Sequence, residues 1–267
     1  MNKRYTCTLL GAGFLGLMVT LSGCGAGRVS VTAAGSTAFQ PFAEKLAEQF
    51  VAAQPEVNVT VQGGGSAVGV QSALSGAAQI GMADLVTLPE EAKALTSIVV
   101  AKDSIAVVVH PSSPVSNLTS EQVRGVFNGT ITNWRDLGGG DHRITVTSRE
   151  AGSGTRSSFE AILGDIRLTK DAIVQDSNGT VRETVANDSG AIGYLSHGLL
   201  NEKIKAVTLD GVECSVENIA NGSYPLVRPV YFLTRGPPEG EVKAFIDYVL
   251  SDEAQATIQK AGLLPAK

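Results

Sequence analysis

Hydrophobic and polar positions change period along the first half of the chain, which predicts strands and helices in turn. The apolar runs cover residues 29–33, 39–53, 57–62, 68–74 and 98–109. Short β-rich runs that alternate with helical patterns are typical of a mostly parallel sheet flanked by helices. The helical period is clearest in the second run, whose apolar face consists of Phe39, Phe42, Leu46 and Phe50. We therefore predict an α/β fold that begins near residue 29.

Two proline-containing breaks divide the remaining chain. The apolar run 104–110 leads into Pro111 and Pro114, and a later apolar run, 225–234, contains two more prolines. Four further elements are predicted between these breaks, at 144–147, 156–163, 181–187 and 192–195, and an amphipathic helix follows at 241–261. The breaks predict that the chain leaves one lobe for another and later returns.

We expect the two crossings near residues 108–112 and 226–231. They give a discontinuous first lobe of residues 29–109 and 230–267, a second lobe of 110–229, and a two-stranded hinge. The length of 267 residues and the hydrophobic content of 43% suffice for one large core or for two lobes of this size.

Glycine and hydroxyl residues form three similar turns, each between an apolar strand and a helix. The turns are Gly35-Ser36-Thr37-Ala38, Gly63-Gly64-Gly65-Ser66 and Gly152-Ser153-Gly154-Thr155. A helix N-terminus presents unpaired N–H groups and a partial positive charge, so it favours anions. Any one turn could be a simple N-cap. Three converging turns would surround a tetrahedral anion with donors, because strand C-termini in open α/β sheets face one crevice.

Other chemistries find little support in the sequence. Gly64 and Gly69 have P-loop spacing, but Val70 and Gln71 stand where Lys and Ser/Thr are required. No serine lies at the centre of a G-x-S-x-G elbow. The three histidines, His110, His142 and His197, have no spacing that suggests a triad or a metal site, and we interpret them as structural or surface residues.

The first residues follow the layout of an export signal. Lys3 and Arg4 precede an apolar stretch at 9–21, and the segment ends Leu21-Ser22-Gly23-Cys24, which resembles a bacterial lipobox. We expect residues 1–23 to be a lipoprotein signal peptide and Cys24 to be lipidated. The alternatives are a plain secretory signal or an uncleaved membrane anchor.

Cleavage would change both the charge and the cysteine content. It would remove two of the 21 basic residues and none of the 26 acidic ones, taking the formal net charge from −5 to −7. Nucleic acid is therefore an unsuitable partner. An anion can still bind through local donors and one or two placed cations. Cys214 would be left without a partner, which predicts a structural thiol.

Several segments resemble the phosphate-binding proteins of bacterial phosphate ABC importers. The third turn, within Ser148 to Arg156, resembles the R-x-x-G-S-G-T segment of that family. Further landmarks are Gly35-Ser36-Thr37, Gly65-Ser66, Ile80 to Asp84, Gly129 to Trp134, Gly190 to Tyr194, Tyr224 to Pro229 and Lys260 to Pro265. They span nearly the whole mature chain, in order. The resemblance implies a two-lobed type II periplasmic-binding-protein fold and the capture of inorganic phosphate without catalysis.

Position by position, the resemblance implies a set of anion ligands from both lobes. The first lobe would contribute Thr37, the Ala38 amide, Ser66 and Asp84, and the second would contribute Arg149, Ser153, Gly154 and Thr155. Asn133 and Trp134 are interpreted as packing residues. The chain departs from the family pattern at Ala151, where many members carry an acid that could orient the arginine, and Glu150 could substitute for it. It departs again at Ala67-Val68, which replace smaller or hydroxyl residues.

We further expect a monomer without metal or cofactor, tethered by lipid at Cys24 outside the cytoplasmic membrane. The resemblance implies that it delivers phosphate to an ABC permease. Another tetrahedral oxyanion, such as arsenate, sulfate or molybdate, would use the same donors, and Asp84 is the residue expected to discriminate phosphate from sulfate. A periplasmic phosphatase is the enzyme alternative, which the residues disfavour because they assemble no metal cluster, paired base or activated nucleophile.

Overall fold

The computed structural model describes residues 28–266, and their strands form one mixed sheet of ten strands and a separate pair. The main path of the sheet runs β2-β1-β3-β11-β4-β8-β6-β7. Its strands are β1 Val29–Gly35, β2 Val57–Gln62, β3 Ile80–Ala83, β4 Thr96–Val109, β6 Thr145–Arg149, β7 Ile173–Gln175, β8 Ala191–Ser196 and β11 Val227–Thr234, with β9 Lys205–Ala206 and β12 Leu264–Pro265 paired to β4. β5 Asn117–Leu118 pairs with β10 Thr208–Leu209.

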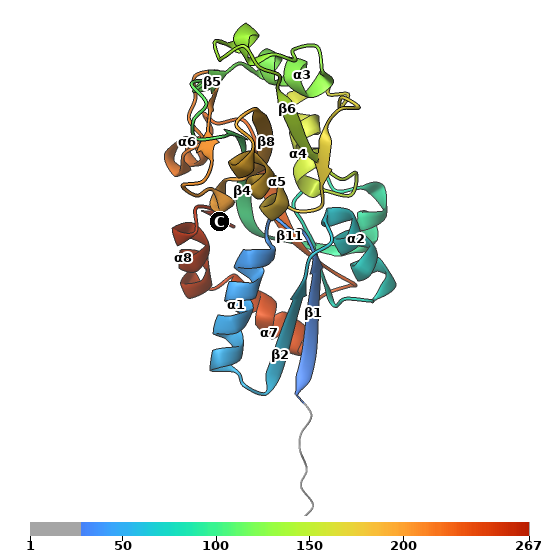
Figure 1. Ribbon diagram of the computed structural model, residues 1–267. Helices are drawn as coiled ribbons and strands as arrows, with labels where there is room; N and C mark the ends of the chain where they lie inside the picture. The colour runs from blue at the N-terminus through green and yellow to red at the C-terminus, as the bar shows by residue number, and fades with distance from the viewer. Residues whose placement is uncertain (1–27, 267) are drawn as a thin grey trace, which may run out of the picture.

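Pairing is parallel within each half of the sheet and antiparallel where the halves join. β1 is parallel to β2 and β3, and β6 is parallel to β7 and β8. β11 is antiparallel to β3 and β4, and β4 is antiparallel to β8. β4 and β11 therefore form the two-stranded connection between the halves, which are the lower and upper parts of Figure 1.

Helices cover both halves. The first half carries α1 Gln40–Ala53, α2 Ser66–Ser75, α7 Gly240–Val249 and α8 Asp252–Lys260, and the second carries α3 Ser120–Asn128, α4 Gly154–Leu163, α5 Asn178–Asn187 and α6 Val216–Ala220. Short 3₁₀ turns are η1 Glu90–Ala94, η2 Trp134–Leu137 and η3 His197–Leu199. None of the helices among residues 28–266 is long and apolar enough to span a bilayer.

The C-terminal helix predicted at 241–261 is two helices. α7 ends at Val249, and the Ser251 hydroxyl accepts a hydrogen bond from the Ala254 amide at the start of α8. The serine side chain competes with the helical backbone and starts a new helix instead. Both helices keep a buried apolar face, so the hydrophobic periodicity continues across the break and predicts a single helix.

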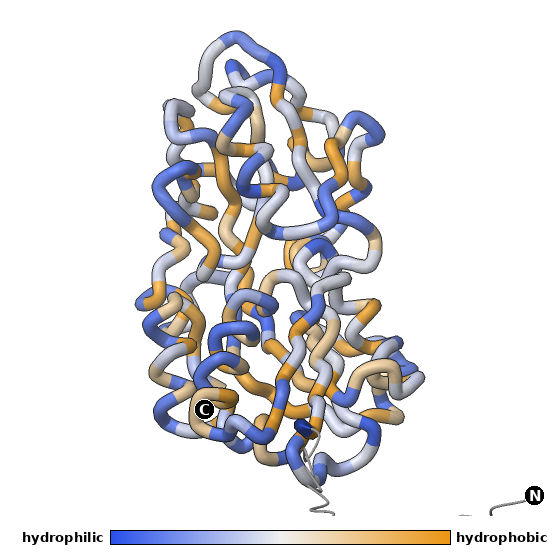
Figure 2. The backbone as a smooth tube through the Cα atoms, turned by 60° about the horizontal axis from the view of Figure 1, so that its bottom comes forward, coloured by the Kyte–Doolittle hydropathy of each residue, from blue (hydrophilic) through white to orange (hydrophobic). Residues whose placement is uncertain are grey.

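Each half has its own hydrophobic core. In the first, Phe50 contacts Phe245 edge-on at 5.3 Å between ring centroids, and in the second Phe159 stacks on Tyr194 at 4.0 Å. Figure 2 shows many of the hydrophobic segments toward the interior and many of the hydrophilic ones at the periphery. Two cores joined by two strands agree with the two-lobed organisation expected from the proline breaks.

The change from one core to the other falls within β4. Val100 and Ala101 pack in the first core, whereas the segment Ile105–Val109 packs in the second and pairs with β8 and β9. Leu226, directly before β11, packs in the second core, and Val230 on β11 packs in the first. This packing favours a first crossing near Ser104, earlier than the expected 108–112, and a second within the expected 226–231. The lobe limits of 109/110 and 229/230 stay a prediction.

Candidate functional site

The three glycine-hydroxyl turns meet at the junction of the lobes. Gly65 donates its N–H to the carbonyl of Gly35 at 2.9 Å, which joins the first two turns. The Ala67 amide donates to the carbonyl of Gly152 at 3.1 Å, which joins the second to the third across the lobes. α2 and α4 begin at the second and third turns, so the first turns of both helices lie at this junction. The convergence expected from the sequence is present, and the lobes are closed on each other.

Close approach at this junction requires glycine at two positions. A Cβ on Gly154 would lie 2.1 Å from Ser66 Oγ and 2.6 Å from Asp84 Oδ1. Gly35, with φ +138°, would place a Cβ 2.2 Å from the Met82 carbonyl oxygen. The chain segments that carry the candidate ligands can therefore touch only because these residues lack side chains.

Asp84 follows β3 directly and lies at the centre of the first-lobe donors. Its Oδ1 accepts from the Ser66 hydroxyl at 2.6 Å, and its amide donates back to the same hydroxyl at 3.0 Å. Its Oδ2 accepts from the Thr155 hydroxyl at 3.3 Å, a contact between the lobes. The Asp84 carboxylate forms an ion pair with Arg228 on β11, and it forms none with Arg149 among the described residues.

Arg149, the last residue of β6, is 1% exposed, and two of its three guanidinium nitrogens have several partners. Nε and Nη2 each donate to a Glu150 carboxylate oxygen at 2.9 Å. Nε also reaches the Gln175 carbonyl at 3.3 Å, and Nη2 reaches the Thr37 hydroxyl and the Asp176 carbonyl at 3.1 and 3.2 Å. Nη1 is buried without a hydrogen-bond partner among the described residues.

The remaining predicted residues line the same place. Thr37 accepts from Arg149 and, at 3.4 Å, from the Asn178 amide group, which leaves its own proton free to donate. Ser153 caps α4 by accepting from the Arg156 amide at 3.2 Å, and it too keeps a proton to donate. Ala38 is 2% exposed beside Thr37. The structure thus brings together all eight positions that the resemblance implied, and their role as ligands stays a prediction.

Four buried polar residues that sequence reasoning missed surround this set: Asp103, Asn178, Ser196 and Arg228. Arg228 on β11 donates to Asp103 on β4, at 2.7 Å from Nη2 and 3.3 Å from Nε. The Ser196 hydroxyl donates to Asp103 Oδ1 at 2.8 Å, and burial raises the pKa of Asp103 above its usual range, against the lowering effect of Arg228. Asn178, at the start of α5, donates to Thr37 and, at 3.3 Å, to Thr155. The polar stretch Lys102-Asp103-Ser104 between two apolar runs of β4 was the signal for Asp103.

The charges in this cluster do not by themselves favour an anion. Two guanidinium groups, of Arg149 and Arg228, face three carboxylates, of Asp84, Asp103 and Glu150. Attraction must therefore come from the hydroxyl and amide donors of the three turns, together with Arg149 Nη1, which has no hydrogen-bond partner among the described residues.

Other predicted features have clear places in the fold. Trp134 is 1% exposed and its indole N–H donates to the Gly190 carbonyl at 2.8 Å, so it packs as expected. His110 contacts Ser112, His197 contacts the Gly262 carbonyl, and His142 is exposed. Among residues 28–266, no group of three or more His, Cys, Asp or Glu side chains is arranged to hold a metal ion. Cys24 and the signal segment lie outside the described residues.

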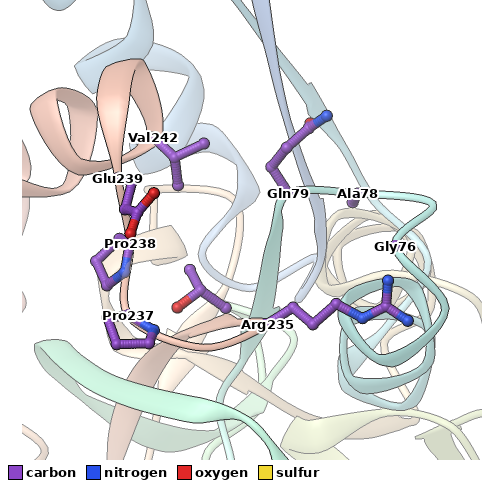
Figure 3. A pocket seen from close by; sticks show the side chains of 9 residues that line it. Gly76, Ala78, Gln79, Arg235, Pro237, Pro238, Glu239 and Val242 are labelled. Carbon is purple, nitrogen blue, oxygen red and sulfur yellow. The ribbon is translucent and has the colours of Figure 1, made fainter.

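Two surface pockets help to delimit the site. One, of about 450 Å³, lies between the turn after α2 and the start of α7, where Arg235, Pro237 and Glu239 line it (Figure 3). It lies beyond the start of β3, at the opposite end of that strand from Asp84, and it shares no residue with the cluster. A second, of about 370 Å³, opens at the seam of the lobes beside Ser66 and Gly152.

Comparisons with known proteins agree with this geometry. Residues 22–253 match the model of a PBP superfamily domain. The chain is 36% identical to the phosphate-binding protein PstS of Bacillus subtilis over 233 residues, which cover 86% of this chain and 78% of that protein. It is 26% identical to PstS of Borreliella burgdorferi, over 89% of this chain and 90% of that one.

Solved structures confirm the fold. A structure described as a phosphate ABC transporter substrate-binding protein with bound phosphate, from Clostridium perfringens, aligns with a TM-score of 0.86 and 37% identity, covering 89% of this chain and all of that one. An ABC-type phosphate transport receptor from Vibrio cholerae aligns with a TM-score of 0.74 and 35% identity, covering 88% and 99%. The predicted family and α/β fold are confirmed: the chain belongs to the PstS family of binding proteins within the PBP superfamily.

Proposed function

We propose that this protein captures inorganic phosphate between its two lobes and delivers it to the permease of an ABC importer. The observation that carries the proposal is Arg149 Nη1, a charged donor that is fully buried and has no hydrogen-bond partner among residues 28–266. A buried unsatisfied donor is costly unless a ligand completes it. The hydroxyl of Thr37, which accepts from the same arginine, and the hydroxyl of Ser153, in the third turn, keep protons to donate. Membership in a family of phosphate-binding proteins supports the same ligand.

The carboxylate of Asp84 suits phosphate better than sulfate. Phosphate keeps at least one proton near neutral pH, and a P–OH can donate to an ionised carboxylate, which only accepts. Sulfate has no such proton, so it would meet a like-charged acceptor in a desolvated cleft. Arsenate shares the proton of phosphate and would be bound by the same donors. Each of these anions would be bound and released unchanged, since binding, not catalysis, is the activity of the family.

Titration calorimetry tests the role of Arg149. We expect one phosphate per chain for the wild-type protein after removal of bound anion, and Arg149→Met to weaken phosphate binding by about 2–5 kcal/mol, the usual cost of breaking a buried charge pair. Arg143→Met is the matched control, because that arginine is 71% exposed and pairs with Asp171. Wild-type affinity in Arg149→Met would remove the arginine from the site.

We place the protein outside the cytoplasmic membrane as a monomer, tethered by lipid at Cys24. The sequence Leu21-Ser22-Gly23-Cys24 supports this attachment, and acyl chains on one residue anchor a protein durably, at about 0.8 kcal/mol per buried methylene. Cys24→Ser should release the protein into the soluble fraction or stall its precursor. Unchanged, detergent-dependent fractionation of Cys24→Ser would contradict the anchor.

A further inference from the structure

Arg228 connects the candidate phosphate site to the strands that join the lobes. Its Nη1 contacts the carboxylate of Asp84 and, at 3.3 Å, the Asp84 carbonyl, while Nη2 contacts Asp103 at 2.7 Å. Arg228 and Asp84 are each 1% exposed and Asp103 is 2% exposed. Arg228 and Asp103 are direct neighbours across the antiparallel pair of β11 and β4. One buried cation therefore links two buried carboxylates.

The network continues from Asp103 back into the cleft. Ser196 donates its hydroxyl to Asp103, and its amide donates to Asn178 Oδ1 at 3.0 Å. Asn178 in turn donates to Thr155, whose hydroxyl donates to Asp84. The chain of contacts closes on itself through residues of both lobes, which fixes the Asp84 side chain from two directions.

The contacts of Asp84 matter because its chemistry depends on a cation. A buried carboxylate without a cationic partner is driven to its neutral form, in which one oxygen carries a proton. A neutral carboxyl would offer a donor where phosphate needs an acceptor for its P–OH, and it would no longer repel sulfate. The fixed guanidinium fork of Arg228 favours the ionised form and holds its orientation.

We infer that Arg228 is a positioning residue that keeps Asp84 an ionised, fixed acceptor, so that the preference for phosphate over sulfate depends on a residue outside the ligand set. Asp103 holds Arg228 in turn, through its place on the neighbouring strand. This inference rests on the proposed function, because it concerns the selectivity of the same site.

Competition titrations of phosphate against sulfate test it in two variants. Arg228→Met/Asp103→Asn removes one positive and one negative charge together, so it avoids leaving two buried carboxylates unpaired. Arg228→Lys keeps the charge without the fork. We expect the phosphate-to-sulfate affinity ratio to fall at least about tenfold in the double variant, equivalent to about 1.4 kcal/mol, and less in Arg228→Lys. Arg143→Met should leave the ratio unchanged.

A second comparison separates positioning from a general structural role. The same substitutions are made in an Asp84→Asn background, where no ionisable group remains for Arg228 to hold. If Arg228 acts through Asp84, its replacement should change the ratio there by less than about twofold, since the two effects are not additive for coupled residues. Thermal unfolding of each variant reports its folding independently.

Each outcome decides the inference. A ratio that falls with the Arg228 substitutions in the wild-type background alone supports it. A phosphate-to-sulfate ratio that is unchanged, that rises, or that falls equally in both backgrounds overturns it. An equal loss of affinity for phosphate and for sulfate leaves the ratio unchanged and therefore also overturns it. If the double variant does not fold, Arg228→Lys alone decides, and an unchanged ratio in it counts against the inference. Absence of phosphate binding by the wild-type protein would instead refute the proposed function.

Discussion

The carboxylate of Glu150 forms a two-pronged ion pair with the guanidinium of the preceding residue, Arg149, with both hydrogen bonds at 2.9 Å. The resemblance left the orientation of this arginine open, because Ala151 stands where many family members carry an acid. In this protein Glu150 orients the arginine instead. It engages Nε and Nη2 and leaves Nη1 pointing away from the pair, without a partner among the described residues.

Removal of Glu150 should therefore weaken phosphate binding. We expect Glu150→Ala to cost about 1–2 kcal/mol of binding free energy, because two charge-assisted hydrogen bonds that orient Arg149 are lost. Loss of a nearby negative charge acts in the opposite direction, but the Glu150 side chain is 31% exposed and solvent screens it. Titration calorimetry measures the change, with Glu183→Ala, which breaks a more exposed ion pair with Arg182, as control. Tighter binding by Glu150→Ala would contradict the orienting role.

A methyl group on Gly154 should block closure of the lobes. Its Cβ would overlap Ser66 and Asp84 of the other lobe, whereas the core packing within each lobe would be unaffected. We expect Gly154→Ala to lose phosphate binding by at least about 100-fold, since the ligands could no longer enclose the anion together. Thermal stability without ligand should stay close to wild type. Small-angle scattering should show compaction on phosphate addition for wild type alone.

Gly179→Ala is the matched control for that experiment. Gly179 is the second residue of α5, and a Cβ there would meet only Ser177 Oγ, at an ordinary 3.7 Å. Full phosphate binding by Gly154→Ala would mean that the closed contacts are not those of the bound state.

The ligand turns could be predicted from the sequence because each one is local. Glycine, hydroxyl residue and helix start lie within four positions, so a short motif specifies a turn and its free amides. The four strand and helix boundaries around Thr37 and Ser153 lie within two residues of the predicted ones. The partner of Asp84 could not be found this way, because Arg228 lies 144 residues away and only the pairing of β11 with β3 and β4 brings it close.

The sequence patterns also failed to predict strand β3 and the break between α7 and α8. β3 is four residues long and fully buried, so its residues show no alternation by which to recognise a strand. The break between α7 and α8 preserves the apolar face of both helices, so hydrophobic periodicity continues across it. For β3 the deciding information was the tertiary environment, whereas the helix break is set locally by the Ser251 cap, which the continuing periodicity obscures.

Cys214 should be almost unreactive in the folded protein. It is 5% exposed beside Ser104, and burial raises the pKa of its thiol to about 11. Because the thiolate is the reactive form, we expect alkylation at pH 8 to be at least about 100-fold slower than in denaturant. The folded thiol holds its proton longer than the unfolded one, so its contribution to stability is lost as pH rises from about 9 to about 11. Mass spectrometry of the peptide that contains Cys214 measures the rate; rapid native labelling would contradict its burial.

The discrimination between anions should reside in Asp84. Asp84→Asn replaces a group that only accepts with one that also donates, so sulfate should gain on phosphate by at least about tenfold, or about 1.4 kcal/mol. Binding of both anions by the wild-type and variant proteins is compared by competition titration. An unchanged ratio would remove Asp84 from the selectivity of the site, although it could still belong to the binding surface.

The central claim is that the closed junction of the two lobes is a phosphate site, and equilibrium titration of the anion-free wild-type protein with inorganic phosphate in excess sulfate tests it most directly. The account predicts saturable binding of one phosphate per chain, with an apparent affinity that a hundredfold excess of sulfate lowers by less than about twofold, because sulfate has no proton to offer Asp84. Absence of saturable phosphate binding, or equal displacement of phosphate by sulfate, would contradict it.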